Sequence, residues 1–269
     1  MEIENSLETI IALIEKMYGF DFSGYSRTSL QRRFLRLMHL TQCKTVEEFI
    51  ELIHYQSIDK NTLINEITVN VTEMFRDPEV FQAMISHIFP YFASLSRFKI
   101  WSAGCSSGEE AYSLAILLEE ARLRQNSLIY GTDIHSELLE KAKAGIYELA
   151  PLKLYSSNYQ QAGGKYSLSN YYTAKYNSFK INAELQKNVV FAPHNLVSDY
   201  SFNEFQLILC RNVLIYFDKT LKNRALQLFI DSLAQGGYLV LGNKESLLFS
   251  PIMKKMEVID AKARIYRKL

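Results

Sequence analysis

Residues 100–118 read IWSAGCSSGEEAYSLAILL. The apolar residues 100–103 predict a buried strand, the small residues of GCSSG predict a tight turn, and the apolar spacing after Glu109 predicts a helix. A strand, a glycine-containing turn and a helix in this order are typical of the nucleotide-binding corner of doubly wound α/β folds. The stretch therefore favours an α/β fold with a ligand at the carboxyl end of this strand.

The turn lacks the features that phosphate ligands require. It matches neither G-x-x-x-x-G-K-[ST] nor G-x-G-x-x-G, because only Gly104 and Gly108 are present. Glu109 and Glu110 place negative charge at the helix N-terminus, which suits the helix dipole but repels a phosphate. S-adenosylmethionine, a ligand with a nucleoside and a cationic group, fits this turn better. An ordinary strand-to-helix turn with N-terminal glutamates stays open as the alternative.

A further acidic residue ends the next apolar run, SLIYGTDI. Asp133 follows Gly108 by about two dozen residues, close to the spacing at which an acidic residue accepts hydrogen bonds from ribose hydroxyls. The same side chain could cap the following helix instead. The turn and this acid together indicate an adenosine cofactor. The missing third glycine and the helix-opening glutamates favour S-adenosylmethionine over NAD.

The chain shows two patterns of organisation. Before residue 70, apolar residues recur at helical spacing over 4–18 and 28–40, and Thr45 and Asp59 are placed to cap two more helices. After Pro90, short apolar runs alternate with helical patterns, which is typical of a mainly parallel sheet. Residues 151–186, rich in Tyr, Ser, Asn and Lys, indicate an inserted subdomain with a short hairpin. We therefore expect an all-helical domain over 1–69 and an α/β domain over 70–269.

Composition narrows the class of protein. The 269 residues carry a formal net charge of +1, so any affinity for acidic partners must come from a local patch. Cys43, Cys105 and Cys210 are too few for a disulfide framework, and no Cys/His cluster has zinc spacing. The first residues lack the basic start of a signal peptide, and no apolar run is long enough to span a bilayer. We expect a cytoplasmic protein without a metal and without membrane insertion.

Two motifs bring polar residues to the expected ligand edge. FQLILCRNVLIYFD places Arg211 and Asn212 at a strand end, followed by Tyr216, for which a core tyrosine is the alternative. NVTEMFRDP, at residues 70–78, carries polar side chains before a proline that is expected to begin a helix. A plain connector in which Asp77 caps that helix is the alternative for this motif.

Arginines form a stripe on the helix predicted over residues 28–40. Arg32, Arg33 and Arg36 share one face, and Arg27 lies just upstream. This face is suited to dock an acidic helix or a phosphate backbone, and an ordinary solvated face is the alternative.

Taken together, these motifs resemble the CheR family of chemoreceptor glutamate methyltransferases. NVTEMFRDP is similar to the family's N-x-T-x-F-F-R-[DE] junction, and IWSAGCSSGEEAYSLA is similar to its W-S-A-A-x-S-x-G-E-E-x-Y-S segment. GTDI, the KAKAGIY run, HNL and CRNVLIYFDK follow in the family's order. The resemblance covers essentially the whole chain. It implies a Rossmann-like class I methyltransferase domain, a helical N-terminal domain and a small inserted β-subdomain.

The resemblance also implies an activity and its residues. The family transfers the methyl group of S-adenosylmethionine to glutamate carboxylates on the cytoplasmic helical domain of a chemoreceptor, leaving S-adenosylhomocysteine. Arg76 and Tyr216 match the residues expected to flank the methyl group, and the face with Arg27, Arg32, Arg33 and Arg36 matches the expected receptor-docking surface. The implied cofactor-lining positions are Asn70, Thr72, Arg76, Ala103, Glu109, Asp133, Asn195, Leu196, Arg211, Asn212 and Tyr216.

Two departures of the sequence from the family bear on function. The family's late H-S-E-N-[FL] stands here within GNKESL, residues 242–247, without the His and the Asn, which questions the role of this loop. AGGKYS in the insertion is a poor match to the loop that grips a receptor pentapeptide in some members, so we expect a pentapeptide-independent enzyme. Two other functions stay open. One is a non-catalytic sensor or scaffold that binds the cofactor or its product, and the other is a methyltransferase acting on another protein or on RNA.

Overall fold

The computed structural model describes residues 2–68 and 70–269 of the chain. By their contacts the residues fall into two compact units. The first unit contains Met1–Asn70 and Tyr216–Ala225, and the second contains Val71–Ile215 and Leu226–Leu269.

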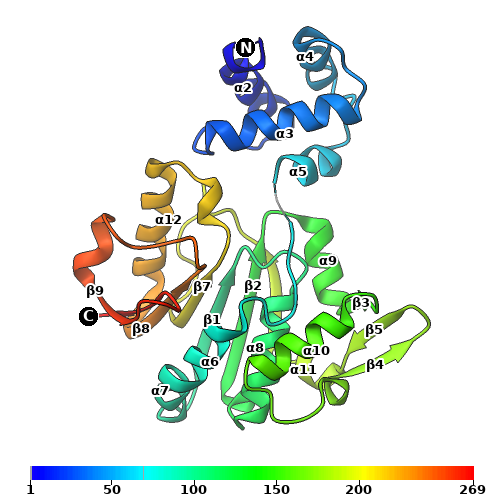
Figure 1. Cartoon of the computed structure of the whole chain (residues 1–269). Coiled ribbons are helices and arrows are strands. Elements are labelled where there is room, and N and C mark those ends of the chain that lie inside the picture. The colour runs from blue at the N-terminus through cyan, green and yellow to red at the C-terminus, as the bar shows by residue number, and fades with distance from the viewer. Residues whose placement is uncertain (1, 69) are drawn as a thin grey trace. The chain divides into compact units, whose positions relative to one another are not determined.

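The first unit is helical, as the sequence predicts. The apolar faces of its helices meet in one core, in which Ile10, Phe34 and Phe49 have no exposed surface. The helix expected over residues 4–18 is interrupted at Ser6 and forms two helices. The helices of this unit are α1 (Glu2–Asn5), α2 (Leu7–Tyr18), α3 (Arg27–Leu40), α4 (Val46–His54) and α5 (Lys60–Ile67) (Figure 1).

Both helix caps expected in this unit are present. The Thr45 hydroxyl accepts a hydrogen bond from the Glu48 amide at 3.2 Å, and the Glu48 carboxylate accepts one from the Lys44 amide at 2.7 Å. The Asp59 carboxylate accepts from two amides in the first turn of α5, both at 3.0 Å. These bonds satisfy amides that have no partner within the helix.

Residues 216–225 group with the helical unit, although the sequence analysis placed them in the α/β domain. The Ser26 amide donates to the Tyr216 carbonyl at 2.8 Å. The rings of Tyr25 and Phe217 meet edge to face with centroids 5.2 Å apart. These contacts join segments that are distant in the sequence, so local patterns could not reveal them.

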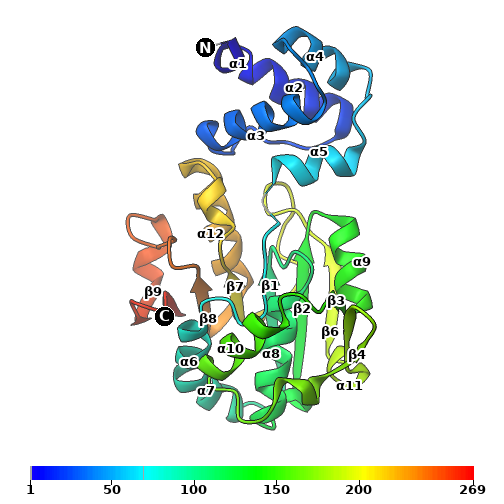
Figure 2. The ribbon, with the colours of Figure 1, turned by 45° about the vertical axis from the view of Figure 1, so that its right-hand side comes forward.

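The second unit is built on a seven-stranded sheet in the order β6-β2-β1-β7-β8-β10-β9 (Figures 1 and 2). The first five strands of that order pair in parallel, which confirms the predicted mainly parallel sheet. β9 and β10 add an antiparallel edge that was not predicted, because MEVID and IYRK are short and partly charged. The strands are β1 (Phe98–Ala103), β2 (Ser127–Asp133), β6 (Val189–Pro193), β7 (Phe205–Cys210), β8 (Leu233–Leu241), β9 (Met256–Asp260) and β10 (Ile265–Lys268).

Helices cover this sheet. α8 packs against β2 and is buried on nearly all sides, which fits its almost unbroken run of apolar residues. Among the described helices, none has both the length and the apolarity that crossing a bilayer requires. The helices of this unit are α6 (Pro78–His87), α7 (Phe89–Ala93), α8 (Glu109–Glu120), α9 (Ser136–Ala144), α11 (Ala183–Gln186) and the part of α12 (Lys219–Ser232) that follows residue 225. The 3-10 turns are at Arg124–Asn126, Leu168–Tyr171, Leu214–Tyr216 and Pro251–Lys255.

The small β-subdomain that the resemblance implies is present, but it begins before the segment predicted at residues 151–186, because its first strand lies at residues 146–148. Its three-stranded sheet has the order β3-β5-β4 and contains the predicted hairpin, and a helix that was not predicted precedes the hairpin. Tyr159 and Tyr171 both donate their hydroxyls to the Glu120 carboxylate of α8, which accounts for part of the tyrosine content. The elements are β3 (Ile146–Glu148), α10 (Leu152–Gln161), β4 (Tyr172–Lys175) and β5 (Ser178–Ile181).

The turn before α8 provides a test of packing. Gly108 has φ +91°, and a Cβ there would lie 2.8 Å from the Ala142 Cβ and 2.9 Å from the Phe191 ring. Gly163 has a similar φ of +93°, but its nearest neighbour would be the Ile85 Cδ1 at 3.5 Å. Alanine at either position would have the same backbone strain, because both φ angles are left-handed. The two variants therefore differ in the steric contacts of the added Cβ. We expect Gly108→Ala to lower the free energy of unfolding by roughly 1–3 kcal/mol more than Gly163→Ala in urea titrations. Equal losses would contradict this packing.

Candidate functional site

The predicted site residues of the second unit gather at one edge of the sheet. β1, β2, β7 and β8 are parallel neighbours, so their carboxyl ends share this edge, where ligands bind in open α/β folds. The loop after β1 holds residues 104–108, and Asp133 ends β2. Arg211 and Asn212 follow β7, and Gly242 follows β8. The structure thus brings together motifs that lie more than a hundred residues apart.

The loop after β1 is fastened to the end of β2. The amides of Gly104 and Cys105 both donate to the Thr132 carbonyl, at 2.8 and 2.9 Å. The Ser106 amide donates to the Asp133 carboxylate at 2.8 Å. Gly104 has φ +75°, and a Cβ there would lie 2.5 Å from the Val213 side chain. The loop therefore needs glycine where it passes close to the chain that follows β7.

Glu109 is a buried carboxylate at the start of α8. The residue is 4% exposed, and both of its carboxylate oxygens accept from the Ser107 hydroxyl, at 2.9 and 2.8 Å. Burial raises the pKa of the Glu109 carboxyl, against the lowering effects of the Ser107 hydrogen bond and of Lys141. No ion pair to Glu109 is formed by the residues that the structure describes. A cationic ligand group would compensate this desolvated charge.

Asp133 organises the same corner. One of its oxygens accepts from the Ser106 amide at 2.8 Å, and the other accepts from the His135 amide at 3.1 Å. The side chain therefore fixes both the loop after β1 and the chain that enters α9. Each carboxylate oxygen has capacity for a further donor. The ribose contact stays a prediction that this geometry permits.

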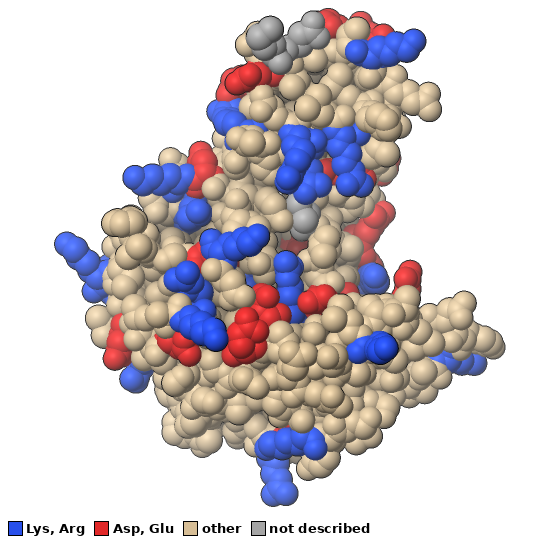
Figure 3. Space-filling view, in the orientation of Figure 1, with Lys and Arg blue, Asp and Glu red and all other residues tan. Residues whose placement is uncertain are grey.

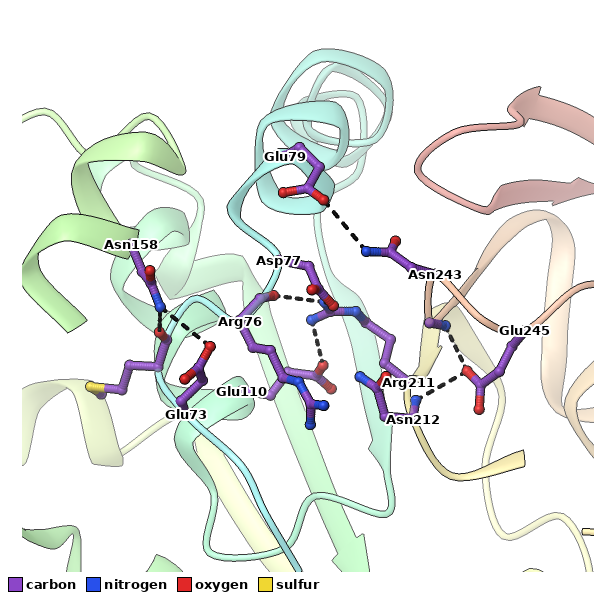
Figure 4. A network of polar contacts seen from close by, with 12 residues as sticks. Glu73, Arg76, Asp77, Glu79, Glu110, Asn158, Arg211, Asn212, Asn243 and Glu245 are labelled. Atoms are coloured by element: carbon purple, nitrogen blue, oxygen red, sulfur yellow. Dashed lines mark hydrogen bonds and ion pairs between the residues drawn. The ribbon is translucent and has the colours of Figure 1, made fainter. Parts of the chain in front are cut away.

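Arg211 lies at the centre of a buried polar network (Figure 4). Its Nη1 donates to the Glu110 carboxylate at 3.0 Å, and its Nη2 donates to the Asp77 carboxylate at 2.8 Å and to the Arg76 carbonyl at 2.6 Å. The side chain is 2% exposed. Asp77 has φ +55° and occupies the N-cap position of α6, where its carbonyl accepts from the Val80 amide at 3.0 Å, but its side chain makes no capping bond. Its carboxylate pairs with Arg211 instead.

Glu245 is a buried carboxylate at this edge that the sequence analysis did not single out. It is 4% exposed and accepts from the amides of Gly242 at 2.6 Å, Asn212 at 3.0 Å and Val213 at 2.9 Å. Burial raises the pKa of the Glu245 carboxyl, against the lowering effect of these backbone hydrogen bonds. The glutamate of the family's late motif is thus retained in GNKESL, and it joins the loop after β8 to the turn after β7. Its retention was the signal available in the sequence.

The remaining predicted residues of this unit lie around the same edge or its approach. Ala103 ends β1 and is buried, and Thr72 is half-buried in the segment that precedes α6. Asn195 forms a turn after β6, accepting from the Val197 amide at 2.9 Å, and Leu196 beside it is buried. The Arg76 Nη1 donates to the Val71 carbonyl at 3.0 Å.

Asn70, Tyr216 and the four arginines belong to the first unit, and their roles stay predictions. Figure 3 shows Lys and Arg side chains gathered over α3. Arg36 forms an ion pair with Glu66 at 2.8 Å, and Arg27 pairs with Glu8. Phe34, Leu37 and Met38 are buried on the opposite face. Two of the four arginines therefore already have a carboxylate partner within their own unit.

The polar side chains at this edge fit S-adenosylmethionine better than a phosphate-bearing ligand. Both carboxylates near the loop, Glu109 and Asp133, are buried, and residues 104–108 contain neither Lys nor Arg. Within the described ranges, no group of three or more His, Cys, Asp or Glu side chains is arranged to hold a metal ion. Acidic groups favour the cationic and hydroxyl parts of an adenosyl sulfonium and disfavour a pyrophosphate.

Comparison with known proteins gives a consistent result. The family model "CheR methyltransferase, SAM binding domain" matches residues 70–263, and "CheR methyltransferase, all-alpha domain" matches residues 5–68. A Pseudomonas putida protein named "Putative methyltransferase Cher3" is 42% identical over 262 residues, covering 97% of this chain and 96% of that protein. Proteins named "Chemotaxis protein methyltransferase" from Listeria innocua and Salmonella typhimurium are 31% and 30% identical. The Listeria match covers 92% of this chain and 92% of that protein, and the Salmonella match covers 93% of this chain and 85% of that protein.

The buried Glu109 carboxylate predicts a pH-dependent stability difference. Because burial raises its pKa in the folded protein, its contribution to stability is full below its unfolded pKa, near 4.3, and is lost as the pH rises through the folded pKa. Glu109→Gln has no such loss and can still accept from Ser107. The variant should match the unsubstituted protein at about pH 4 and exceed it in free energy of unfolding at about pH 7.

Urea titrations at the two pH values measure this difference. Glu257 on β9 is the matched control, because it is exposed and solvated. Glu257→Gln should show no gain that grows with pH. A Glu109→Gln variant that loses stability at neutral pH would mean that the carboxylate is compensated within the protein.

Proposed function

Because this chain belongs to the CheR methyltransferase family, we propose that it transfers the methyl group of S-adenosylmethionine to glutamate side chains of chemoreceptors, forming methyl esters. The observation that carries the proposal is the pair of buried carboxylates, Glu109 and Asp133, beside a glycine loop at the carboxyl edge of a parallel sheet. The relatives named chemotaxis protein methyltransferase support a receptor as the substrate.

The residues of the second unit supply a binding surface for the cofactor. S-adenosylmethionine, when bound, supplies a methyl group activated by a positively charged sulfur. Glu109 would attract the cationic part of the ligand, and Asp133 would accept from the ribose hydroxyls while it holds the Ser106 amide. Glu245 keeps the neighbouring turn at Asn212 in place through backbone amides, so the edge is built before the ligand arrives.

The chemistry requires orientation more than acid–base catalysis. A glutamate carboxylate has a reference pKa near 4.3 and is already ionised at neutral pH, so no general base is needed. Holding the reacting groups in line can lower the barrier by roughly 7–11 kcal/mol. We assign an orienting role to Arg76 and a second one to Tyr216, since a guanidinium and a phenol hydroxyl can each donate a hydrogen bond to a carboxylate.

The partner in this proposal is the helical cytoplasmic domain of a receptor. A receptor helix that carries methyl-accepting glutamates is acidic. Among the described residues, Arg32 and Arg33 of α3 form no ion pair, so we propose that they attract this helix. Electrostatic attraction of this kind raises the association rate and weakens with salt.

The direct experiment uses labelled S-adenosylmethionine and a purified receptor cytoplasmic fragment. After incubation, mild base should release the label from the receptor as methanol, because carboxyl methyl esters hydrolyse under conditions that leave N-methyl groups intact. Base-stable label on the receptor, or label found on RNA, would contradict the proposal. A chain that binds S-adenosylmethionine but transfers no label would be a sensor instead.

Substitution of the two orienting residues should separate turnover from binding. We expect Arg76→Ala and Tyr216→Phe each to lower kcat by roughly 100-fold, because small losses of alignment are costly, and to weaken cofactor affinity much less. The measurement is initial rates of receptor methylation beside titration calorimetry with S-adenosylmethionine.

Arg97 and Tyr55, both exposed, provide matched controls. Arg97→Ala and Tyr55→Phe should leave kcat unchanged. Near-normal turnover in both Arg76→Ala and Tyr216→Phe would remove these residues from the mechanism.

A further inference from the structure

We propose that Arg211 is a positioning residue, which fixes the strained turn Phe75–Asp77 from within the protein and thereby sets the place of Arg76. The inference rests on the proposed function, since the position of Arg76 matters only where Arg76 orients reactants. It assigns Arg211 a role different from the cofactor contact that the sequence resemblance implies.

The turn that carries Arg76 is held in an unusual conformation. Phe75 has φ +54° and Asp77 has φ +55°, so the two residues that flank Arg76 both adopt left-handed backbone angles. L residues with side chains of this size rarely adopt these angles, and they persist only where surrounding contacts enforce them. Pro78 then begins α6. The direction in which Arg76 leaves the backbone is therefore set by its neighbours' contacts.

Arg211 grips the second half of this turn. A single nitrogen, Nη2, donates to the Arg76 carbonyl at 2.6 Å and to the Asp77 carboxylate at 2.8 Å. The other terminal nitrogen donates to Glu110 at 3.0 Å, and Glu110 also accepts from the Ser102 hydroxyl of β1 at 2.8 Å. The fork thus ties the turn to the sheet and to the first turn of α8 (Figure 4).

Packing keeps the guanidinium in one plane. Its central carbon lies 5.5 Å from the ring centroid of Phe81, which belongs to α6. With 2% of the side chain exposed, water does not compete for its hydrogen bonds. A planar, buried guanidinium has little freedom to move, so it holds the turn in a fixed position relative to the sheet.

Other groups hold the first half of the turn. The Phe75 amide donates to the Ser113 hydroxyl at 2.9 Å, and the Asn158 amide nitrogen donates to the Met74 carbonyl at 3.2 Å. The Phe75 ring lies 5.2 Å from that of Tyr159 on α10. These contacts fix Phe75 and the residue before it. The contacts that fix the Arg76 carbonyl and the Asp77 side chain come from Arg211.

Most of the hydrogen-bonding capacity of the Arg211 side chain is used within the protein. Three of its five N–H groups have protein acceptors, one on Nη1 and two on Nη2, and the Nε atom is buried without a partner in the described part of the chain. A shift of the guanidinium toward a ligand would weaken its ion pairs with Glu110 and Asp77. Its effect on the reaction therefore passes through Arg76.

The test uses Arg211→Lys in the full-length chain, because lysine keeps the charge between Glu110 and Asp77 but lacks the fork. Methylation of the receptor fragment and calorimetric binding of S-adenosylmethionine are measured in the unsubstituted and the Arg76→Lys backgrounds. We expect Arg211→Lys to lower kcat roughly 10- to 100-fold in the unsubstituted background, with cofactor affinity nearly unchanged. In the Arg76→Lys background, the further loss of kcat should be less than about twofold.

Asp77→Ala is the second variant, since it removes the anchor of the fork on the turn and leaves Arg211 intact. It should reproduce the loss of kcat with the same unchanged cofactor affinity. If Arg211→Lys weakens cofactor binding as much as it lowers kcat, Arg211 contacts the cofactor and the proposal is wrong. The same conclusion holds if the loss of kcat is equal in both backgrounds, or if Arg211→Lys leaves kcat unchanged.

Arg124 provides the matched control within the same unit. Its side chain is 13% exposed and donates to the Glu184 carbonyl at 2.9 Å and to Asn188 at 2.8 Å, after the C-terminal end of α8. Arg124→Lys should cost stability without lowering kcat, and a matching loss of kcat would reduce the Arg211 effect to general destabilisation. Failure of the proposed function has a separate signature, because the unsubstituted protein itself would then form no methyl ester.

Discussion

Two hydrogen bonds hold the ligand edge of this protein together, from the Gly104 and Cys105 amides to the Thr132 carbonyl at 2.8 and 2.9 Å. They draw the loop after β1 against the end of β2, which places the Ser106 amide on Asp133 and begins α8 at Glu109. Parallel pairing makes this possible, since neighbouring strands end at the same edge. These two bonds therefore bring the start of α8, with Glu109, to the end of β2, where Asp133 lies.

Several charged side chains are buried at this edge, and they differ in the groups that compensate their charge. Arg211 forms ion pairs with both Glu110 and Asp77, and Glu245 is satisfied by backbone amides. Glu109 has a hydroxyl partner but no ion pair among the described residues. A carboxylate left in that state costs folding free energy unless a cation joins it. This difference between Glu109 and its neighbours favours a ligand with a positive charge.

The sequence predicted the elements well because their signals are local. The strand, turn and helix around residues 100–118, the caps at Thr45 and Asp59, and the hairpin in the insertion all follow from neighbouring residues. The network around Arg211 could not be predicted in this way, since Asp77 lies 134 positions away and pairs with it only through the tertiary fold. The same reason hid the grouping of residues 216–225 with the helical unit. The altered GNKESL loop looked doubtful in the sequence, and the structure explains how Glu245 maintains it.

The central claim is that the loop at residues 104–108, with Glu109 and Asp133, holds an adenosyl sulfonium. A crystal structure of the protein with S-adenosylhomocysteine tests this most directly. The account predicts ribose density beside Asp133 and the amino acid end of the ligand near Glu109. Density for the ligand elsewhere on the chain, or a crevice at this edge closed by protein side chains, would contradict it.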